Sequence, residues 1–284
     1  MGSVWQQSPM AESRTRHSDS GPFPGGRPDE GGMLAVERVE QIGESVILYD
    51  GSLANHMREA WFEPATWPDA PRAPGYAGGR GATLFIRCEA QDWVLRHYHR
   101  GGRVARVASD GFLWTGERRV RSFVEWRLLA RLQQAGLPAP RPVAARYRRS
   151  GVVYRADIIT LRLPGVEPLS TRMATGPLLP AVWRSVGECI GRFHAANVFH
   201  ADLTAHNLQI DAQDRIFLLD FDRGRIMPGP GAWRQRNLRR LHRSFTKITA
   251  AGTSGFSVDS WHGLLAGYTA VAGGAGGDSL PGRA

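Results

Sequence analysis

The chain has 284 residues, 42% of them hydrophobic, which is enough for one large domain or two modest lobes with a buried core. Its two cysteines, Cys88 and Cys189, are too few and too far apart for a disulfide framework or a zinc cluster, and they suit a reducing compartment. Neither a signal-peptide stretch nor an apolar run of the roughly 20 residues in a membrane helix is present, so we expect a soluble or peripheral protein.

The net charge of +10 indicates an anionic partner, such as nucleic acid, a phosphorylated substrate or a membrane surface. All but one of the 36 basic residues are arginine, and the exception is Lys247. Any step that ordinarily uses a lysine earlier in the chain must therefore use another side chain here.

The N-terminal part of the chain is predicted to be a tail followed by strands. Residues 1–40 are rich in Ser, Gly, Pro and charge, and this composition predicts disorder. A glycine-rich turn over 75–81 precedes an apolar strand at 82–86, and a short polar turn then leads to a strand at 93–98.

A helix is predicted over 121–136, because Phe123, Trp126 and Leu129 recur near the helical period and Gly136 stands where a C-terminal cap belongs. The elements expected after it, in chain order, are a strand at 152–161, a hinge at Pro164-Gly165, a helix at 179–196, short strands at 208–210 and 216–219, and a flexible Gly- and Ala-rich tail at 269–284.

Three polar residues in the second half fit phosphoryl transfer. That reaction needs a carboxylate to orient the accepting hydroxyl and take its proton, and oxygen ligands for Mg²⁺, which holds the nucleotide phosphates. Asp202 lies in a predicted loop, Asn207 follows five residues later, and Asp220 comes after an apolar strand. We predict that Asp202 is the catalytic base and that Asn207 and Asp220 are the metal ligands. As single residues they could equally be ordinary turn residues.

The longer pattern around these residues is more specific, and it resembles the catalytic loop and metal-binding motif of the protein-kinase superfamily. Over roughly 45–268 the chain is similar to the 3-deoxy-D-manno-octulosonic acid (Kdo) kinases of lipopolysaccharide inner-core synthesis. The motifs that carry this resemblance are Gly79-Arg-Gly81, Val94-Leu-Arg-His-Tyr98, Arg100-Gly-Gly102, Glu125-Trp-Arg-Leu-Leu129, His200-Ala-Asp-Leu-x-Ala-His-Asn207, Asp220-Phe-Asp-Arg-Gly224 and Asn237-Leu-x-Arg-Leu241.

The resemblance implies an α+β, two-lobed protein-kinase-like fold. Its small β-rich N-lobe would span 41–163 and its mainly helical C-lobe 164–268, which agrees with the order of the predicted elements. It also implies ATP and Mg²⁺ as cofactors.

The nucleotide-binding residues depart from the ordinary protein-kinase pattern. Arg96 occupies the third-strand position where a lysine usually holds the α- and β-phosphates, and Glu125 on the next helix is its expected partner. A guanidinium can bind phosphate bidentately, so the exchange is chemically viable. The alternatives are a solvated strand arginine or an inactive pseudokinase. Gly79 and Gly81 are predicted to belong to the phosphate-covering loop, or else to an ordinary turn.

The catalytic loop departs from that pattern as well. Ala201 replaces the arginine that usually senses a phosphorylated activation loop, and Thr204 stands where a lysine is usual. The segment after Asp220 is short and broken by prolines. These features favour a constitutively active kinase of a small or lipid-linked substrate. We expect a structural role for His200, whereas His206 and Asp222 could contact substrate or metal, or brace the loop.

The segment Trp233–Ile248 is predicted to be an amphipathic helix. Its basic residues on one face are Arg236, Arg240, Arg243 and Lys247. One interpretation is a core-packed helix with a solvated basic side. The other is a face that meets anionic lipid headgroups or the phosphates of a lipid A precursor.

Taken with the resemblance, these features predict an ATP-dependent kinase that phosphorylates a Kdo hydroxyl, by resemblance the 4-hydroxyl, on a Kdo-bearing lipid A precursor. We expect a peripheral protein on the anionic surface of the bacterial inner membrane, at its cytoplasmic face. No nucleic-acid recognition motif is visible, so nucleic acid is not an expected partner. The alternatives are a heptose or other small-molecule kinase of the same fold, and a catalytically inactive membrane-surface scaffold.

Overall fold

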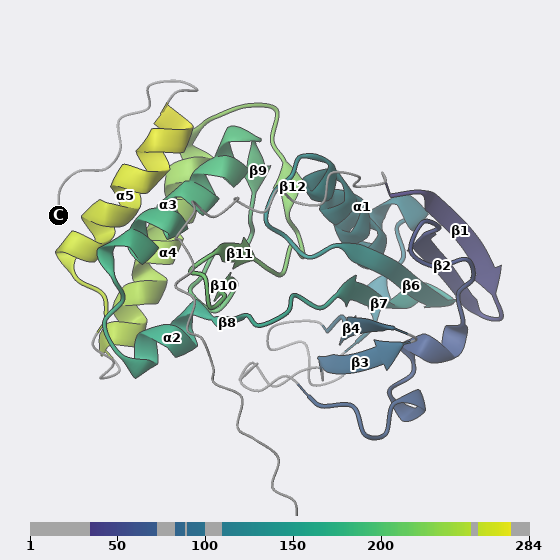
Figure 1. The fold of residues 1–284 in the computed structure, drawn as a ribbon. Coiled ribbons are helices and arrows are strands. Elements are labelled where there is room, and N and C mark those ends of the chain that lie inside the picture. Colours follow the sequence, from purple (N-terminus) through teal and green to yellow (C-terminus); the bar gives the residue numbers. More distant parts are fainter. Residues whose placement is uncertain (1–34, 73–82, 89, 100–109, 251–254, 274–284) are drawn as a thin grey trace, which may run out of the picture. The chain divides into compact units, whose positions relative to one another are not determined.

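The computed structural model describes residues 35–72, 83–88, 90–99, 110–250 and 255–273. Within them a β-rich N-lobe precedes a mainly helical C-lobe (Figure 1), which confirms the α+β order expected from the sequence. The N-lobe elements are β1 (Glu37–Ile42), β2 (Ser45–Asp50), η1 (Glu59–Phe62), η2 (Pro64–Thr66), β3 (Leu84–Cys88), β4 (Gln91–His97), β5 (Phe112–Leu113), η4 (Glu117–Arg119), α1 (Arg121–Gln134), β6 (Pro142–Ser150) and β7 (Val153–Leu161).

The N-lobe strands form one antiparallel sheet in the order β1-β2-β6-β7-β4-β3, with β5 added beside β7. Successive side chains of a strand point to opposite faces, and strands β2 and β6 are buried on both faces. Leu48 packs in the same hydrophobic cluster as helix α1, whereas its neighbours Ile47 and Tyr49 pack with the η1 segment in a second cluster. Strand β4, which carries Arg96, is held between β3 and β7 and is thereby fixed in place.

Helix α1 packs against β6 and β7 and ends as the sequence predicts. Gly136 has a φ of 62°, and its N–H donates to the carbonyl of Gln133 at 2.9 Å. The N–H of Leu137 donates to the carbonyl of Leu132, also at 2.9 Å, which completes a Schellman cap. The buried side chains of Trp126 and its neighbours fix the rotation of the helix, and this decides where Glu125 points.

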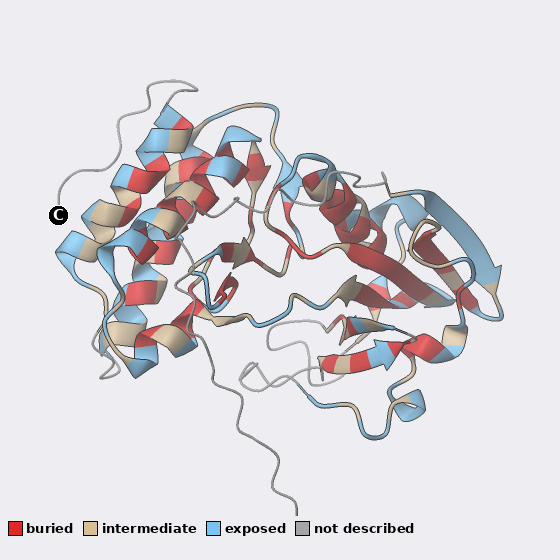
Figure 2. Cartoon of the chain, viewed as in Figure 1, coloured by how far each residue is buried: buried red, intermediate tan, exposed pale blue. Residues whose placement is uncertain are grey.

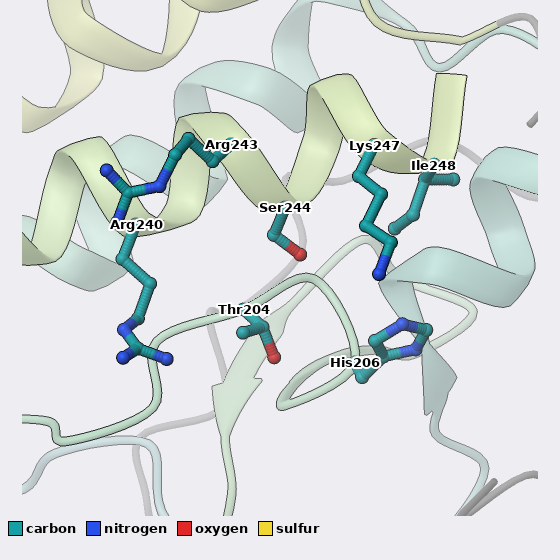
Figure 3. A pocket seen from close by; sticks show the side chains of 7 residues that line it. All are labelled: Thr204, His206, Arg240, Arg243, Ser244, Lys247 and Ile248. Atoms are coloured by element: carbon teal, nitrogen blue, oxygen red, sulfur yellow. The ribbon is translucent and has the colours of Figure 1, made fainter. Parts of the chain in front are cut away.

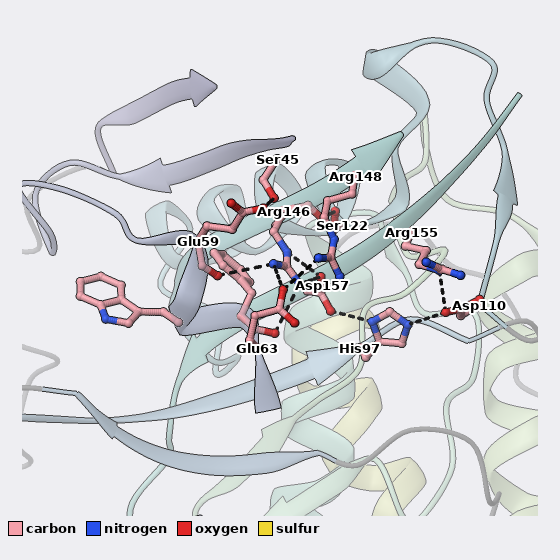
Figure 4. Close-up of polar contacts among 12 residues, drawn as sticks. Ser45, Glu59, Glu63, His97, Asp110, Ser122, Arg146, Arg148, Arg155 and Asp157 are labelled. Carbon is pink, nitrogen blue, oxygen red and sulfur yellow. Dashed lines mark hydrogen bonds and ion pairs between the residues drawn. The ribbon is translucent and has the colours of Figure 1, made fainter. Parts of the chain in front are cut away.

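An ionic network crosses the N-lobe sheet on the face away from α1 (Figure 4). The guanidinium of Arg146 is 1% exposed and donates to Asp157 at 2.8 Å and to Glu63 at 2.6 Å. Asp157 also accepts a hydrogen bond from Nδ1 of His97 at 2.6 Å. The network ties the η1–η2 segment to β4 at the residue next to Arg96.

The C-lobe begins after a turn at Pro164-Gly165, the predicted hinge position. Its elements are β8 (Glu167–Pro168), α2 (Leu169–Thr175), α3 (Pro180–Ala195), β9 (Val198–Phe199), β10 (Leu208–Ile210), β11 (Ile216–Leu218), β12 (Arg225–Ile226), α4 (Ala232–Ala250) and α5 (Val258–Ala272). Helices α3 and α5 lie side by side (Figure 1) because Gly187 and Gly267 let the two backbones approach closely. None of the helices in the described ranges combines the length and hydrophobicity that a membrane span requires.

Two boundaries differ from the sequence prediction. Strand β1 begins at Glu37, inside the expected tail 1–40, and helix α5 continues to Ala272, inside the expected tail 269–284. The side chains of β1 are nearly all exposed, so its sequence lacks the hydrophobic pattern of a buried strand. Strand β6 in the same sheet is mostly buried (Figure 2). Backbone pairing with β2 holds β1, and close packing on α3 holds the glycine-containing α5. The rest of both predicted tails lies largely outside the described residues.

Candidate active site

Asp202 lies in the loop between β9 and β10, and its backbone is held on both sides. Its N–H donates to Nδ1 of His200 at 3.2 Å, and its carbonyl accepts from the side-chain amide of Asn207 at 2.8 Å. The carboxylate itself is 56% exposed. The loop therefore presents the carboxylate to solvent from a fixed backbone, as a base acting on an incoming hydroxyl requires.

His200 is buried and has the structural role expected from the sequence. A carbonyl oxygen can only accept, so the contact of 2.9 Å between Nε2 and the carbonyl of Leu219 places the ring proton on Nε2. Nδ1 is then free to accept from the backbone of Asp202. Burial lowers the pKa of His200, although the Leu219 hydrogen bond acts the other way, so the ring is neutral. It joins the catalytic loop to the segment that carries Asp220.

Asn207 and Asp220 stand at the same end of the β10–β11 hairpin. Asn207 precedes β10, Asp220 follows β11 closely, and the N–H of Leu219 donates to the carbonyl of Asn207 at 2.8 Å. Asp220 has a φ of 62°, an uncommon conformation for a residue other than glycine and one often found at functional sites. The structure thus brings together the two predicted metal ligands, which are separated in sequence by the β10–β11 hairpin.

This pair suits magnesium better than a metal that needs a protein cage. Mg²⁺ is usually held by one or two carboxylate or amide oxygens, with waters and substrate phosphates completing its coordination. Asn207 and Asp220 supply two such groups. No cluster of three or more His, Cys, Asp or Glu side chains suitable for a metal occurs in the part of the chain that the structure describes.

Arg96 connects the predicted nucleotide-binding residues. From β4, one terminal nitrogen contacts Glu125 on α1 and the other contacts Asp220. Burial alone would raise the pKa of Asp220, but the charge and hydrogen bond of Arg96 outweigh it and hold that pKa below its usual value. A solvated strand arginine would not make these contacts, so this interpretation of Arg96 is not supported.

Glu125 is 3% exposed, and the hydroxyl of Tyr98 donates to its second oxygen. Burial raises the pKa of Glu125 to about 7, even though the neighbouring charge of Arg96 lowers it. Helix α1 has a second tie to the metal-ligand segment, because Arg121 forms a two-pronged ion pair with Asp222. Asp222 therefore braces the site, which was one of the two roles considered for it.

The other predicted nucleotide contacts, Gly79 and Gly81, lie outside the described residues. The remaining predicted site residues form two connected groups. One is the Arg96, Glu125 and Asp220 set, and the other is the Asp202 loop, which His200 and Asn207 join to it.

Comparison with known proteins decides the family. Residues 65–268 match the lipopolysaccharide kinase (Kdo/WaaP) family. The chain belongs to this family. Relatives named 3-deoxy-D-manno-octulosonic acid kinase include one from Stenotrophomonas maltophilia strain K279a, 44% identical over 74% of this chain and 83% of its own. Another, from Xanthomonas oryzae pv. oryzae strain PXO99A, is 41% identical over 78% of this chain and 87% of its own. Among solved structures, the bifunctional kinase-methyltransferase WbdD aligns with a TM-score of 0.44 and 16% identity, covering 72% of this chain and 46% of that one.

In this kinase, helix α4 supplies a contact to the predicted base, Asp202, that the sequence did not reveal. Arg240 pairs with Oδ1 of Asp202, across 38 positions of sequence. The position two residues after Asp202, where protein kinases carry a lysine, is Thr204, so the positive charge beside the base comes from α4 instead. The motif Asn237-Leu-x-Arg-Leu241 was the available signal, but the sequence shows no link from it to Asp202.

Asn237, one turn earlier on α4, holds the catalytic loop in place. Its side-chain nitrogen donates to the carbonyl of His200 at 2.7 Å, and its oxygen lies 3.3 Å from Nε2 of His194 on α3. Burial lowers the pKa of His194 to about 3, so the ring is neutral and Tyr268 completes its hydrogen bonding at 3.0 Å. The buried hydrogen bonds of Asn237 and His194 fix the position of α4 relative to the catalytic loop.

A cavity of about 510 Å³ opens between α4 and the catalytic loop (Figure 3). The polar side chains lining it are Thr204, His206, Arg240, Arg243, Ser244 and Lys247. His206 also contacts the hydroxyl of Ser170 at 2.8 Å, so it both braces the loop and faces the cavity. Since Arg240 also contacts Asp202, the cavity adjoins the predicted catalytic base.

Proposed function

We propose that the chain is an ATP-dependent kinase that phosphorylates a Kdo hydroxyl, the 4-hydroxyl, on a Kdo-bearing lipid A precursor. The observation that carries the proposal is the linked set of Asp202, Asn207, Asp220, Arg96 and Glu125, in a member of the lipopolysaccharide kinase family. The relatives' names supply the sugar, and the resemblance supplies the position of the hydroxyl and the lipid acceptor.

Asp202 would act as the base. Arg240 holds Oδ1, which leaves Oδ2 of the exposed carboxylate to accept a hydrogen bond from the sugar hydroxyl. As the hydroxyl oxygen forms its bond to the γ-phosphorus, the bond from that phosphorus to the β-γ bridging oxygen breaks, and ADP leaves. The hydroxyl proton passes to Asp202.

Asn207 and Asp220 would hold Mg²⁺, and Arg96, oriented by Glu125, would bind the nucleotide phosphates. When bound, the metal would offset the negative charge of the nucleotide phosphates. Glu125, itself hydrogen-bonded to Tyr98, orients Arg96 from the buried side.

We further propose that the protein works peripherally at the cytoplasmic face of the inner membrane, where a lipid-linked acceptor would be presented. The net charge of +10 supports attraction to an anionic surface. Nucleic acid stays an unexpected partner.

The test is transfer from γ-labelled ATP to a Kdo-bearing lipid A precursor by the purified full chain. We expect labelled acceptor with wild type, and a loss of at least about 100-fold in kcat with Asp202→Asn, because the amide cannot take the proton. Phosphorus NMR of the product would locate the phosphate. Transfer to heptose or another sugar instead would replace the proposed substrate, and absence of ATP binding would indicate an inactive scaffold.

A further inference from the structure

The cavity beside the catalytic loop holds positive charge that the proposed reaction does not use. Arg240 is paired with Asp202, but Arg243 and Lys247 line the same cavity without a carboxylate partner among the described residues. Helix α4 contains no acidic residue along its length. The repulsion among these cations would be relieved by a ligand anion, and the charge is placed in a hollow that can hold one.

Three of the lining side chains on α4 face the same loop. Arg240, Ser244 and Lys247 follow one another at helical spacing, and their side chains point from α4 toward the loop that carries Thr204 and His206 (Figure 3). The hydroxyl oxygen of Ser244 accepts from the N–H of Ala205 at 3.1 Å, so its own hydrogen remains available. The cavity therefore offers guanidinium, ammonium and hydroxyl donors from one side.

We propose that this cavity binds an oxyanion of the acceptor, a carboxylate or a phosphate ester, through Arg243 and Lys247, beside the hydroxyl that Asp202 orients. The identity of the acceptor rests on the proposed function. A carboxylate is the favoured source, because a sugar acid carries it on the same small molecule as the reacting hydroxyl, and Arg240 joins the cavity to the base. The anion subsite would then set the orientation of the sugar, and specificity for an acidic sugar would follow.

A simpler role for Lys247 is to stabilise the end of α4, since cations are favourable near a helix C-terminus. If this were its only role, Lys247 would affect thermal stability, and sugar ligands would not change how fast its amine reacts with a modifying reagent. A protection experiment therefore separates the two roles.

Lys247 is the only lysine in the chain, so an amine-reactive reagent has one side-chain target, and peptide mass spectrometry separates it from the terminal amine. Modification would be timed with the full chain in the presence of free Kdo, inorganic phosphate, a phosphorylated lipid A precursor without Kdo, or anionic phospholipid vesicles. We expect free Kdo to slow modification about tenfold at saturation, and high salt to weaken the effect.

Protection by inorganic phosphate supports binding of an anion in the cavity, and the other probes identify its source. Protection by free Kdo supports a carboxylate as the ligand, and protection by the Kdo-free precursor supports a phosphate ester. Protection by phospholipid vesicles alone overturns the inference in favour of a membrane-contacting face, and protection by none of the probes overturns it outright.

Kinetics give an independent measure. Lys247→Gln and Arg243→Gln are each expected to raise the KM for the Kdo-bearing acceptor about tenfold, with the KM for ATP unchanged, because each removes one charge-assisted hydrogen bond. Lys247→Arg should restore most of the affinity. Arg239→Gln is the matched control, since Arg239 is an exposed cation of α4 outside the cavity.

The experiments can refute the proposed function and the anion subsite independently. If wild type transfers phosphate to no Kdo acceptor, the proposed function fails, while protection of Lys247 by inorganic phosphate still decides whether the cavity binds anions. If transfer is normal, but Lys247 is unprotected and the acceptor KM is unchanged in both variants, the anion subsite alone is refuted.

Discussion

Glu125→Gln isolates the energetic consequence of burying the carboxylate that orients Arg96. Glutamine keeps the shape of the side chain and an oxygen for Arg96, and the hydroxyl of Tyr98 can accept from its amide instead of donating. What the variant loses is the titrating proton. In the wild type the buried carboxyl must ionise at a cost, with the negative charges of Asp220 and Asp222 adding to that cost and Arg96 offsetting part of it.

The magnitude follows from the pKa of Glu125, which burial raises from 4.5 to about 7. A difference of this size corresponds to roughly 3 kcal/mol of folding free energy. The sign follows from proton binding. Between these two pH values the folded state binds more protons than the unfolded state, so the stabilisation by protonated Glu125 is complete below pH 4.5 and is lost as the pH rises through about 7.

The assay is urea unfolding of wild type and Glu125→Gln from about pH 5 to about pH 8, with EDTA and without nucleotide. The quantity to compare is the difference in unfolding free energy between the two proteins. The change in ionisation of His194 and His200 on unfolding is the same in both proteins and cancels in this difference. We expect the variant to gain roughly 3 kcal/mol relative to wild type across this range.

Glu117→Gln is the matched control, because Glu117 also accepts a hydrogen bond from a tyrosine, Tyr147, but at an exposed site. Its unfolding free energy should run parallel to that of wild type at every pH. If the difference between wild type and Glu125→Gln is also constant with pH, burial does not control the ionisation of Glu125 and the reasoning is refuted.

Two further predictions concern stability. An added Cβ at Gly187 would lie 1.9 Å from the carbonyl oxygen of Leu264, so Gly187→Ala should lower the unfolding free energy by about 1–3 kcal/mol, whereas Gly263→Ala, with 3.7 Å to its nearest neighbour, should be neutral or stabilising. Equal effects in thermal melts would contradict close α3–α5 packing. Arg146→Met should cost about 3–5 kcal/mol in urea unfolding, because it leaves the buried carboxylate of Asp157 without its guanidinium partner. Arg148→Met, at a half-exposed ion pair, should cost at most about 1 kcal/mol. A small loss in Arg146→Met would show that water reaches the network.

The sequence predicted correctly which residues lie close together where their separation along the chain decides it. Asp202 and Asn207 share one short loop, and the apolar strands after it form a hairpin, so Asp220 returns beside Asn207. Arg96 and Glu125 were placed by family resemblance and by the pattern of α1, and the structure joins them. Local geometry of this kind follows from the order of residues along the chain.

The boundaries of the fold were less visible in the sequence. Strand β1 has exposed side chains on both faces, so only its backbone pairing with β2 identifies it. Helix α5 contains glycines that weaken a helical prediction, yet Gly267 is required where α5 meets α3. In both cases a contact with another element outweighs local preference.

By itself the sequence determined the reaction class, because the catalytic loop and the metal-ligand segment carry their residues at short, fixed separations. Only the tertiary structure decided which side chain lies beside Asp202. Arg240 reaches Asp202 because Asn237 and His194 fix α4 against the loop, a consequence of side-chain packing and buried hydrogen bonds that no spacing encodes. The basic helix face was expected either to be solvated or to meet anionic lipid headgroups or the phosphates of a lipid A precursor. Three of its four cations line a cavity next to the predicted base.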